Sequence, residues 1–341
     1  MSSNIQSSFD FNVQEKTMTK RMDYDNNSKN SLKVGGLFAG IGGIELGFKK
    51  VGFEILWANE IDKHAAITYR KNHNHTLFEK DLKKLQTNEV EKIDILTGGF
   101  PCQAFSVAGY RKGFEDDRGN VFFEILRFID ELKPKVIFLE NVKNLQGHDE
   151  GRTFNIILNE LENRGYHISY KVLNSSEYAN VPQNRERIYI VGFKNKNAHD
   201  NFDFPKPKKL TKTVNDLLDD EAEEKFYYSK SKYYPQLKEE MKNADTVYQW
   251  RRKYVRENKS KLCPTLTANM GTGGHNVPLI IDKKDIRKLT PRECARFQGY
   301  DDNFILCDSL APSHLYKQIG NSVTVPVIEA IAKEIKKALN V

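Results

Sequence analysis

The sequence predicts a two-lobed α/β protein, in which a mainly parallel sheet forms the first lobe and a smaller, irregular module is inserted late in the chain. Between residues 32 and about 195, apolar runs alternate with amphipathic stretches, which is the pattern of βαβ units. The composition changes at Phe204-Pro205-Lys206-Pro207-Lys208-Lys209 and stays polar and tyrosine-rich to about Asp285. Amphipathic periodicity then returns and predicts helices over Ile286–Phe297 and Pro326–Leu339.

Five strands and four helices are expected in the first lobe, and they alternate along the chain. The strands are expected at Lys33–Phe38, Glu54–Ala58, Ile93–Thr97, Val136–Glu140 and Ile188–Phe193. The helices are expected at Ile44–Val51, Lys63–Asn72, Val121–Leu132 and Thr153–Arg164. Parallel strands joined by helices end at one edge of the sheet, where open α/β sheets bind their ligands.

The remaining chain divides around this lobe. Residues 1–31 are rich in Ser, Asn, Asp and Lys, which predicts a mobile leader, with a short helix around Val13–Met22 as the alternative. The first lobe is then expected over 32–200, the inserted module over 201–285, and a return to the first lobe over 286–341.

Composition places the chain among globular proteins with a basic surface. Hydrophobic residues make up 39% and charged residues 29% of the 341 residues, and the formal net charge is +7. A basic balance favours a phosphate-rich partner, although many basic proteins bind no nucleic acid. The N-terminus has no apolar signal region and no run reaches the length of a membrane span, so a cytoplasmic protein without a membrane partner is expected.

Cysteine and histidine spacing gives no indication of a metal site. The four cysteines form no C-x-x-C pair, which argues against a zinc site or a disulfide framework and favours a reducing compartment. Six histidines show no ligand-like spacing to acids or cysteines and are interpreted as core or surface residues: His64, His73, His75, His148, His275 and His314. No metal is expected.

A glycine-rich turn follows the first strand. Phe38-Ala39-Gly40-Ile41-Gly42-Gly43 opens a helix, so its backbone can approach a ligand closely. Glu60 ends the second strand, where a carboxylate can accept ribose hydroxyls, and Asp81 follows the next helix. The spacing differs from G-x-G-x-x-G, so a dinucleotide is not favoured, and a turn without any ligand is the alternative.

A cysteine stands in a constrained loop after the third strand. Gly98-Gly99-Phe100-Pro101-Cys102 places Cys102 at the carboxyl end of a parallel strand. A cysteine in such a loop, at a helix N-terminus, can ionise in part and act as a nucleophile, whereas a buried and inert cysteine is the alternative. Glu140 at the end of the next apolar strand, with Arg185 and Arg187 before another strand, is expected at the same edge.

The inserted module contains a basic and aromatic segment. Gln249–Lys261 interleaves arginines and lysines with Trp250 and Tyr254. It is followed by Pro264–His275, whose glycines permit close approach to DNA. Arginines that pair with guanine edges specify sequence, while contacts to phosphates position a protein; a solvated basic strand is the alternative.

Together these segments resemble the motifs of the bacterial DNA cytosine-5 methyltransferase family, in the same order. The motifs are Phe38-Ala39-Gly40-Ile41-Gly42-Gly43, Gly99-Phe100-Pro101-Cys102-Gln103, Glu140-Asn141-Val142, Gln183-Asn184-Arg185-Glu186-Arg187, Leu289-Thr290-Pro291-Arg292-Glu293-Cys294-Ala295-Arg296 and Gly320-Asn321-Ser322-Val323. The resemblance implies a Rossmann-like large domain that depends on S-adenosylmethionine, with a smaller target-recognition domain.

The resemblance also implies roles for individual residues. Cys102 is the expected nucleophile, Glu140 and Arg187 are expected to hold the target cytosine, and Arg185 to support the loop and contact phosphate. The S-adenosylmethionine pocket is expected to comprise Phe38, Ala39, Gly40, Ile41, Gly42, Gly43, Glu60, Ile61, Asp81, Leu82, Pro101, Asn321 and Val323. DNA contacts are expected from Gln103, Ser106, Arg251, Arg252, Arg256, Thr265, Leu266 and Gly273.

The implied partner is double-stranded DNA with a short recognition site, which is methylated at carbon 5 of a flipped-out cytosine. The enzyme is expected to be a monomer. It is expected to act in a restriction–modification system that includes a cognate endonuclease. Three alternatives stay open at this point. They are a transfer RNA cytosine-5 methyltransferase of the same fold, a non-catalytic DNA-binding regulator, and a nicotinamide oxidoreductase, which would leave the Pro-Cys loop and the basic insert unexplained.

Overall fold

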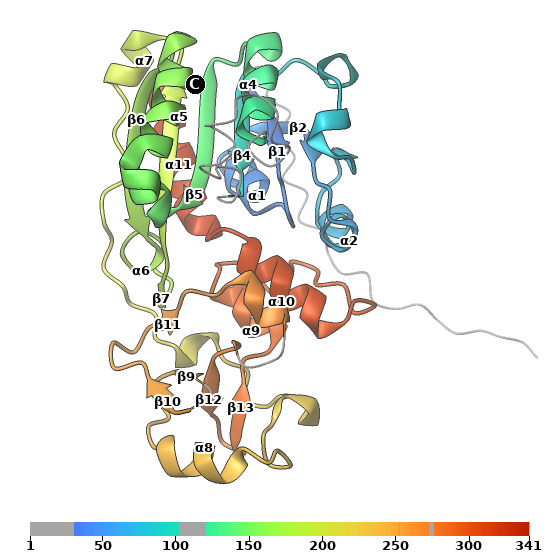
Figure 1. The fold of residues 1–341 in the computed structure, drawn as a ribbon, viewed down its shortest axis with the longest axis vertical. Coiled ribbons are helices and arrows are strands. Elements are labelled where there is room, and N and C mark those ends of the chain that lie inside the picture. Colours follow the sequence, from blue (N-terminus) through green and yellow to red (C-terminus); the bar gives the residue numbers. More distant parts are fainter. Residues whose placement is uncertain (1–30, 102–120, 252, 273–275, 341) are drawn as a thin grey trace, which may run out of the picture.

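The computed structural model describes residues 31–101, 121–251, 253–272 and 276–340. Its two lobes are shown in Figure 1, with a large sheet in the upper lobe, a small sheet in the lower lobe, and α9 (Pro291–Arg296) and α10 (Pro312–Asn321) between them. The predicted leader and its alternative helix at Val13–Met22 lie outside the described residues.

The large sheet has seven strands in the order β3-β2-β1-β4-β5-β8-β6. Its strands are β1 Lys33–Leu37, β2 Glu54–Asn59, β3 Thr76–Phe78, β4 Ile95–Gly99, β5 Val136–Val142, β6 His167–Asn174 and β8 Glu186–Phe193. The first five strands of that order pair in parallel, while β8 runs antiparallel to β5 and to β6. All five predicted strands are present, and the prediction of a mainly parallel sheet is confirmed.

Two strands of this sheet were not predicted. β3 has three residues, too few to show a period, and β6 lies at the edge of the sheet with one of its eight residues buried. Period-based reasoning needs one face of a strand to be buried, so an edge strand with two polar faces escapes it.

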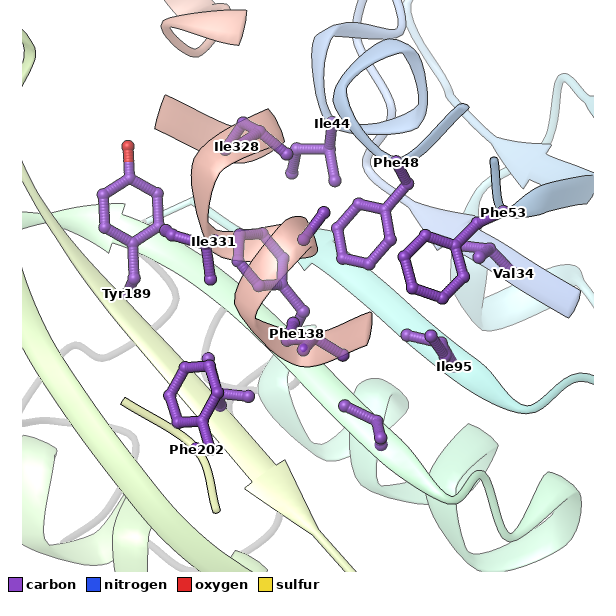
Figure 2. Close-up of a cluster of buried hydrophobic side chains, with 14 of the residues drawn as sticks. Val34, Ile44, Phe48, Phe53, Ile95, Phe138, Tyr189, Phe202, Ile328 and Ile331 are labelled. Carbon is purple, nitrogen blue, oxygen red and sulfur yellow. The ribbon is translucent and has the colours of Figure 1, made fainter. Parts of the chain in front are cut away.

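Helices cover both faces of the large sheet. The predicted helices are α1 Gly43–Lys50, α2 Lys63–Asn72, α4 Val121–Leu132 and α5 Arg152–Asn163. On one face, α1 and the C-terminal helix α11 (Val325–Ala338) share one buried cluster with β1, β4 and β5. Figure 2 shows Phe48 of α1 and Ile331 of α11 beside Phe138 of β5. α4 and α5 pack on the other face. The end of the chain therefore lies against the helix that follows the first strand.

The inserted module is more regular than predicted. It contains a four-stranded sheet in the order β10-β9-β12-β13, built from β9 Tyr248–Trp250, β10 Val255–Glu257, β12 Leu279–Ile281 and β13 Ile286–Lys288. Helix α8 (Tyr234–Glu240) packs on one face of it through Leu237. Each strand of this small sheet is three residues long, which is too short to give a regular pattern in the sequence.

The helix predicted over Ile286–Phe297 is wrong in its first half. Ile286–Lys288 is strand β13, and α9 begins only after Thr290, whose side chain accepts a hydrogen bond from the backbone N–H of Glu293. The apolar residues happen to fit a helical spacing across both elements. The capping box and the proline at the start of α9 were the signals of the true boundary.

Short elements complete the fold. The helices are α6 Ser175–Tyr178 and α7 Lys196–Asp200, and the short strands are β7 Gln183–Asn184 and β11 Cys263–Pro264. The 3-10 segments are Leu82–Lys84, Thr87–Glu89, Lys143–Gly151, Asn215–Leu217, Glu224–Phe226 and Ala268–Gly271. Within the described ranges, no helix combines the length and the apolar character needed to cross a membrane.

Candidate active site and nucleic-acid interface

The predicted site residues gather at the carboxyl edge of the large sheet, because β1, β2, β4 and β5 run in parallel and end there. The glycine turn follows β1, Glu60 follows β2, Pro101 follows β4, and Glu140 lies near the end of β5. Residues more than one hundred positions apart in the sequence are thus brought to one edge.

The turn after β1 has an unusual backbone. Phe38, Gly40 and Gly42 all have positive φ, at 56°, 58° and 88°. A β-carbon at Gly42 would lie 2.0 Å from Nε2 of His73, so this position has no room for a side chain, whereas a β-carbon at Gly40 would meet no atom within 4 Å. The turn is therefore closely packed against His73 at Gly42 and open at Gly40.

Glu60 joins this turn to β2. One carboxylate oxygen accepts the backbone N–H of Gly40 at 2.7 Å, and the other accepts the N–H groups of Ile61 and Asp62 at 2.8 and 2.7 Å. Glu60 is only 8% exposed, but its neighbour Ile61 is 62% exposed. A buried carboxylate, an open glycine turn and an exposed aliphatic surface are the features that a ribose and a flat base require.

The rest of the predicted cofactor set divides by exposure. Asp81 follows β3, and its side chain accepts from the N–H of Lys83 at 3.0 Å. The four apolar residues of the set with buried side chains would meet a ligand mainly through their backbones: Ala39, Ile41, Leu82 and Val323. The predicted set is therefore brought together at one edge, but with unequal access to a ligand.

The C-terminal segment lies against the start of α1. A β-carbon at Gly43 would lie 2.9 Å from Oγ of Ser322 and 2.9 Å from Cγ2 of Val323. Ser322 also shares a hydrogen bond of 2.6 Å with the hydroxyl of Tyr300. Asn321, at the end of α10, is exposed beside this contact. The segment expected to close the cofactor pocket thus touches the helix that opens from the glycine turn.

Glu140 and Arg187 form a largely buried ion pair. Nε of Arg187 lies 3.2 Å from Oε1 of Glu140, and the two side chains are 13% and 11% exposed. Burial raises the pKa of Glu140, and the charges of Arg187 and Arg185 act in the opposite direction. The pair lies beside β4, where Gly99 is the partner of Glu140 in register, two residues before Pro101.

Asn141 links this pair to the nucleophile loop. It is 3% exposed, its Nδ2 donates to the carbonyl of Phe100 at 2.8 Å, and its Oδ1 accepts from the N–H of Val142 at 2.8 Å. Sequence reasoning quoted this residue only as part of a motif and gave it no role. A polar side chain inside an otherwise apolar strand was the available signal.

We expect Asn141→Asp to slow turnover by about 10- to 100-fold, because a carboxylate cannot donate to Phe100 and the loop before Cys102 shifts. Affinity for S-adenosylmethionine should not change, and single-turnover kinetics with equilibrium binding separates the two effects. Tyr166→Phe is a matched control, since that hydroxyl also donates to a buried carbonyl, that of Pro134 at 2.6 Å. Equal losses in both variants would show that Asn141 only stabilises the fold.

Arg185 lies where it can support the surrounding loops, as expected, but not where it can contact phosphate. It is 2% exposed, and its guanidinium donates to the carbonyls of Leu266 at 2.7 Å, of Gly320 at 3.4 Å and of Ser322. The expected phosphate contact does not agree with this burial. Arg185 instead ties the insert and the C-terminal segment to the strand that carries Arg187.

Leu266 also departs from its prediction. Its side chain is 1% exposed in a core cluster, so it does not present a DNA-contacting surface. Its backbone N–H donates to Oε1 of Gln183 at 3.1 Å, while the hydroxyl of Thr265 donates to the carbonyl of Asn184 at 2.7 Å. Strands β7 and β11 pair at the same place. This segment of the insert is a structural connection to the catalytic edge.

Two predicted DNA-contacting arginines lie at the surface. Arg251 and Arg256 belong to the recognition hairpin, defined here as β9, β10 and the described residues between them (248–251 and 253–257), and both are exposed. Arg256 also lines a groove of about 710 Å³ with Asn184 of β7. The hairpin therefore faces the segment 183–187, which carries Arg185 and Arg187.

Five predicted site residues lie outside the described ranges: Cys102, Gln103, Ser106, Arg252 and Gly273. Among the residues that the structure does describe, no group of three or more His, Cys, Asp or Glu side chains could hold a metal ion. Three cysteines are described, and each is buried and free: Cys263, Cys294 and Cys307.

Known proteins are similar to this chain in sequence and in fold. The family model for C-5 cytosine-specific DNA methylases matches residues 32–337. The type II methyltransferase M.Bsp6I of Bacillus sp. (strain RFL6) is 59% identical over 90% of this chain and 99% of its own length. The type II methyltransferase M.SsoII of Shigella sonnei is 40% identical over 93% of this chain and 83% of its own. The solved structure of the S. pombe Dnmt2 methyltransferase superposes with a TM-score of 0.72 at 20% identity, over 91% of this chain and all of that one (100%), which shows a shared fold.

Proposed function

Because the chain belongs to the C-5 cytosine-specific DNA methylase family and is a DNA cytosine-5 methyltransferase, we propose that it methylates a flipped-out cytosine within a short duplex site, with Cys102 as nucleophile. The observation that supports this assignment best is the buried Glu140–Arg187 pair, which lies beside the strand leading into Pro101-Cys102. An acid and a cation thus lie beside β4, the strand whose sequence continues through Phe100 and Pro101 into Cys102.

S-adenosylmethionine is the cofactor that the family implies, and the described residues fit it. Glu60 is proposed to accept the ribose hydroxyls, Ile61 to cover the adenine, and Gly40 to leave room for the chain that bears the sulfonium. Asn321 and Val323 are proposed to close the pocket from the C-terminal side. When bound, this cofactor supplies an electrophilic methyl group to carbon 5 of the base.

The protein's own residues then have separate tasks. The thiolate of Cys102 attacks carbon 6 of cytosine, which removes the aromaticity of the ring and makes carbon 5 nucleophilic. Glu140 donates a proton to ring nitrogen 3, and its raised pKa keeps it protonated to higher pH than an ordinary glutamate. Arg187 holds the carbonyl oxygen of the base. After methyl transfer, loss of the carbon 5 proton to water and return of the nitrogen 3 proton to Glu140 restore the ring and expel the thiolate of Cys102.

The target cytosine has to leave the duplex, because neither face of its ring is accessible to Cys102 inside the base stack. Flipping costs roughly a few kcal/mol, which contacts to the rest of the site must offset. We propose residues 201–288, the expected 201–285 extended by strand β13, as the target-recognition domain that makes these contacts, with residues 32–200 and 289–341 as the catalytic domain.

Methyl transfer from labelled S-adenosylmethionine to duplex DNA and to transfer RNA tests the substrate. DNA is the expected acceptor, since the insert carries a basic hairpin beside the catalytic edge. Covalent trapping on DNA that contains 5-fluorocytosine tests the role of Cys102 and separates an enzyme from a DNA-binding regulator. Bisulfite sequencing of plasmid DNA from expressing cells then identifies the site, for which we expect a short, GC-rich palindrome.

We expect Arg251→Ala and Arg256→Ala to weaken binding at the cognate site, each by roughly 1–3 kcal/mol if the arginine reads a guanine. A reading arginine should also lose preference at one base position, whereas a phosphate-binding arginine should weaken binding to all sequences equally and flatten the salt dependence. Kd values on cognate and singly substituted duplexes at two salt concentrations distinguish these cases. If these two variants and Arg252→Ala all keep full discrimination between cognate and substituted duplexes, the arginines do not read the site. The Thr265–Gly274 loop then becomes the expected source of specificity.

The biological setting is proposed from the type II relatives. We propose that the protein acts as a cytoplasmic monomer and protects DNA against a cognate endonuclease of the same site. Plasmid DNA from expressing cells should resist that endonuclease, and the methyltransferase should migrate as a single copy of the 341-residue chain in size-exclusion chromatography.

A further inference from the structure

We propose that Gln249 is a specificity-determining residue, which holds the side chain of Arg251 in the orientation that reads a base. This inference rests on the proposed DNA-reading role of the recognition hairpin. It assigns to the hairpin a second residue type, an uncharged amide, whose function is to orient a neighbouring guanidinium.

The position of Gln249 in β9 directs it away from the core of the small lobe. Its neighbours Tyr248 and Trp250 are 1% and 6% exposed and pack in a cluster with Leu237 of α8. Successive side chains of a strand point to opposite faces, so Gln249 lies on the face opposite α8. In the register of the hairpin, Arg256 of β10 is its direct partner and shares that face.

This second face of the small sheet is covered at one end and open at the other. Val247, next to β9, and Ile280 of β12 are buried in a cluster that includes Ile319 of α10. Arg256, further along the same face, is exposed and lines the groove that reaches Asn184. The open end therefore continues toward Asn184, which directly precedes Arg185 and lies three positions before Arg187.

Arg251 is held by contacts on its backbone and its side chain. Its N–H donates to the carbonyl of Tyr254 at 2.9 Å, and its own carbonyl accepts from the N–H of Lys253 at 2.7 Å. Its Nη2 donates to Oε1 of Gln249 at 3.2 Å. One nitrogen of the exposed guanidinium is thus held by the amide oxygen of Gln249.

Such an arrangement suits bidentate recognition of guanine. Arginine has five N–H donors, and a guanine edge uses only two of them. Ordering a long side chain opposes binding, and a side chain that is already ordered in the free protein avoids that loss. Removing Gln249 should therefore weaken cognate binding by about three- to tenfold, with most of the loss at the base that Arg251 reads.

A double-mutant cycle tests this coupling. Kd values are measured for the wild type, Gln249→Ala, Arg251→Ala and the double variant, on the cognate duplex and on duplexes substituted at single positions. Gln236→Ala is the matched control, because that glutamine contacts the carbonyl of Lys253 at 3.4 Å from the α8 side of the same turn. We expect Gln249→Ala to lose affinity and discrimination, to cause no further loss in the Arg251→Ala background, and to exceed the control.

The conservative variant Gln249→Glu keeps an acceptor for Arg251. It should retain discrimination at that base, while its charge weakens binding to all duplexes alike. Additive losses in the cycle, or unchanged discrimination in Gln249→Ala, would overturn the inference while leaving a reading role for Arg251 intact. If Arg251→Ala itself keeps full affinity and discrimination, the proposed reading role of Arg251 fails first, and the inference fails with it.

Discussion

Cys102→Ser is expected to abolish methyl transfer, with a loss on the order of 10⁴-fold or more in turnover. A serine hydroxyl is almost fully protonated at neutral pH, whereas a thiol in such a loop ionises readily and its thiolate is the attacking form. Binding of S-adenosylmethionine and of cognate duplex should be retained, because Glu60, Arg187 and the hairpin are unchanged. Labelled methyl transfer and DNA binding, measured on the same preparation, check both parts.

Cys307→Ser is the matched control for this experiment. Cys307 is 9% exposed, and its sulfur shares a hydrogen bond with the hydroxyl of Ser309 at 3.1 Å, so serine can replace it with little disturbance. It lies far along the chain from the catalytic loop, and this variant should keep wild-type turnover. Appreciable methylation by Cys102→Ser, or loss of the covalent adduct in both variants, contradicts the assignment of the nucleophile.

Glu140→Gln should slow the chemical step by about two to four orders of magnitude, since an amide can hydrogen-bond to the base but has no acidic proton to donate. Substrate affinity should change much less. Glu186→Gln is the control, because Glu186 begins the same strand as Arg187 but pairs at the surface with Lys143 at 2.9 Å. Single-turnover rates measure the effect, and a loss below tenfold would remove Glu140 from the proton transfer.

The pH dependence of the wild type follows from the same group. Burial raises the pKa of Glu140 above its ordinary value, so the protonated form persists to higher pH and is lost as the pH rises through the raised pKa. The rate should therefore fall on the alkaline side, as the pH rises through the raised pKa of Glu140. In Glu140→Gln the alkaline limb due to this carboxyl should disappear. A pH profile of the same shape in both proteins would assign that limb to another group.

Much of the fold could be predicted because its elements have strong local signals. The helix at Lys63–Asn72 begins and ends where it was predicted, and the helix predicted over Val121–Leu132 ends at Leu132, since each buries one face at helical spacing. β5 was predicted because a run of four apolar residues precedes Glu140. β13 was misassigned, because three residues with a helical spacing of apolar positions cannot be told from the start of a helix.

The sequence by itself determined the family, the order of the motifs and the residue types of the site, because a nucleophile, an acid and a glycine turn each need a particular side chain or backbone at a particular strand end. Only the tertiary structure decided which of these residues are enclosed by contacts from other segments. Arg185 and Arg187 are two positions apart, yet Arg185 is bonded to three buried carbonyls while Arg187 pairs with Glu140. Contacts from Leu266, Gly320 and Ser322, far away in sequence, make that difference. Burial is set by segments that pack from elsewhere in the chain, and no local pattern contains them.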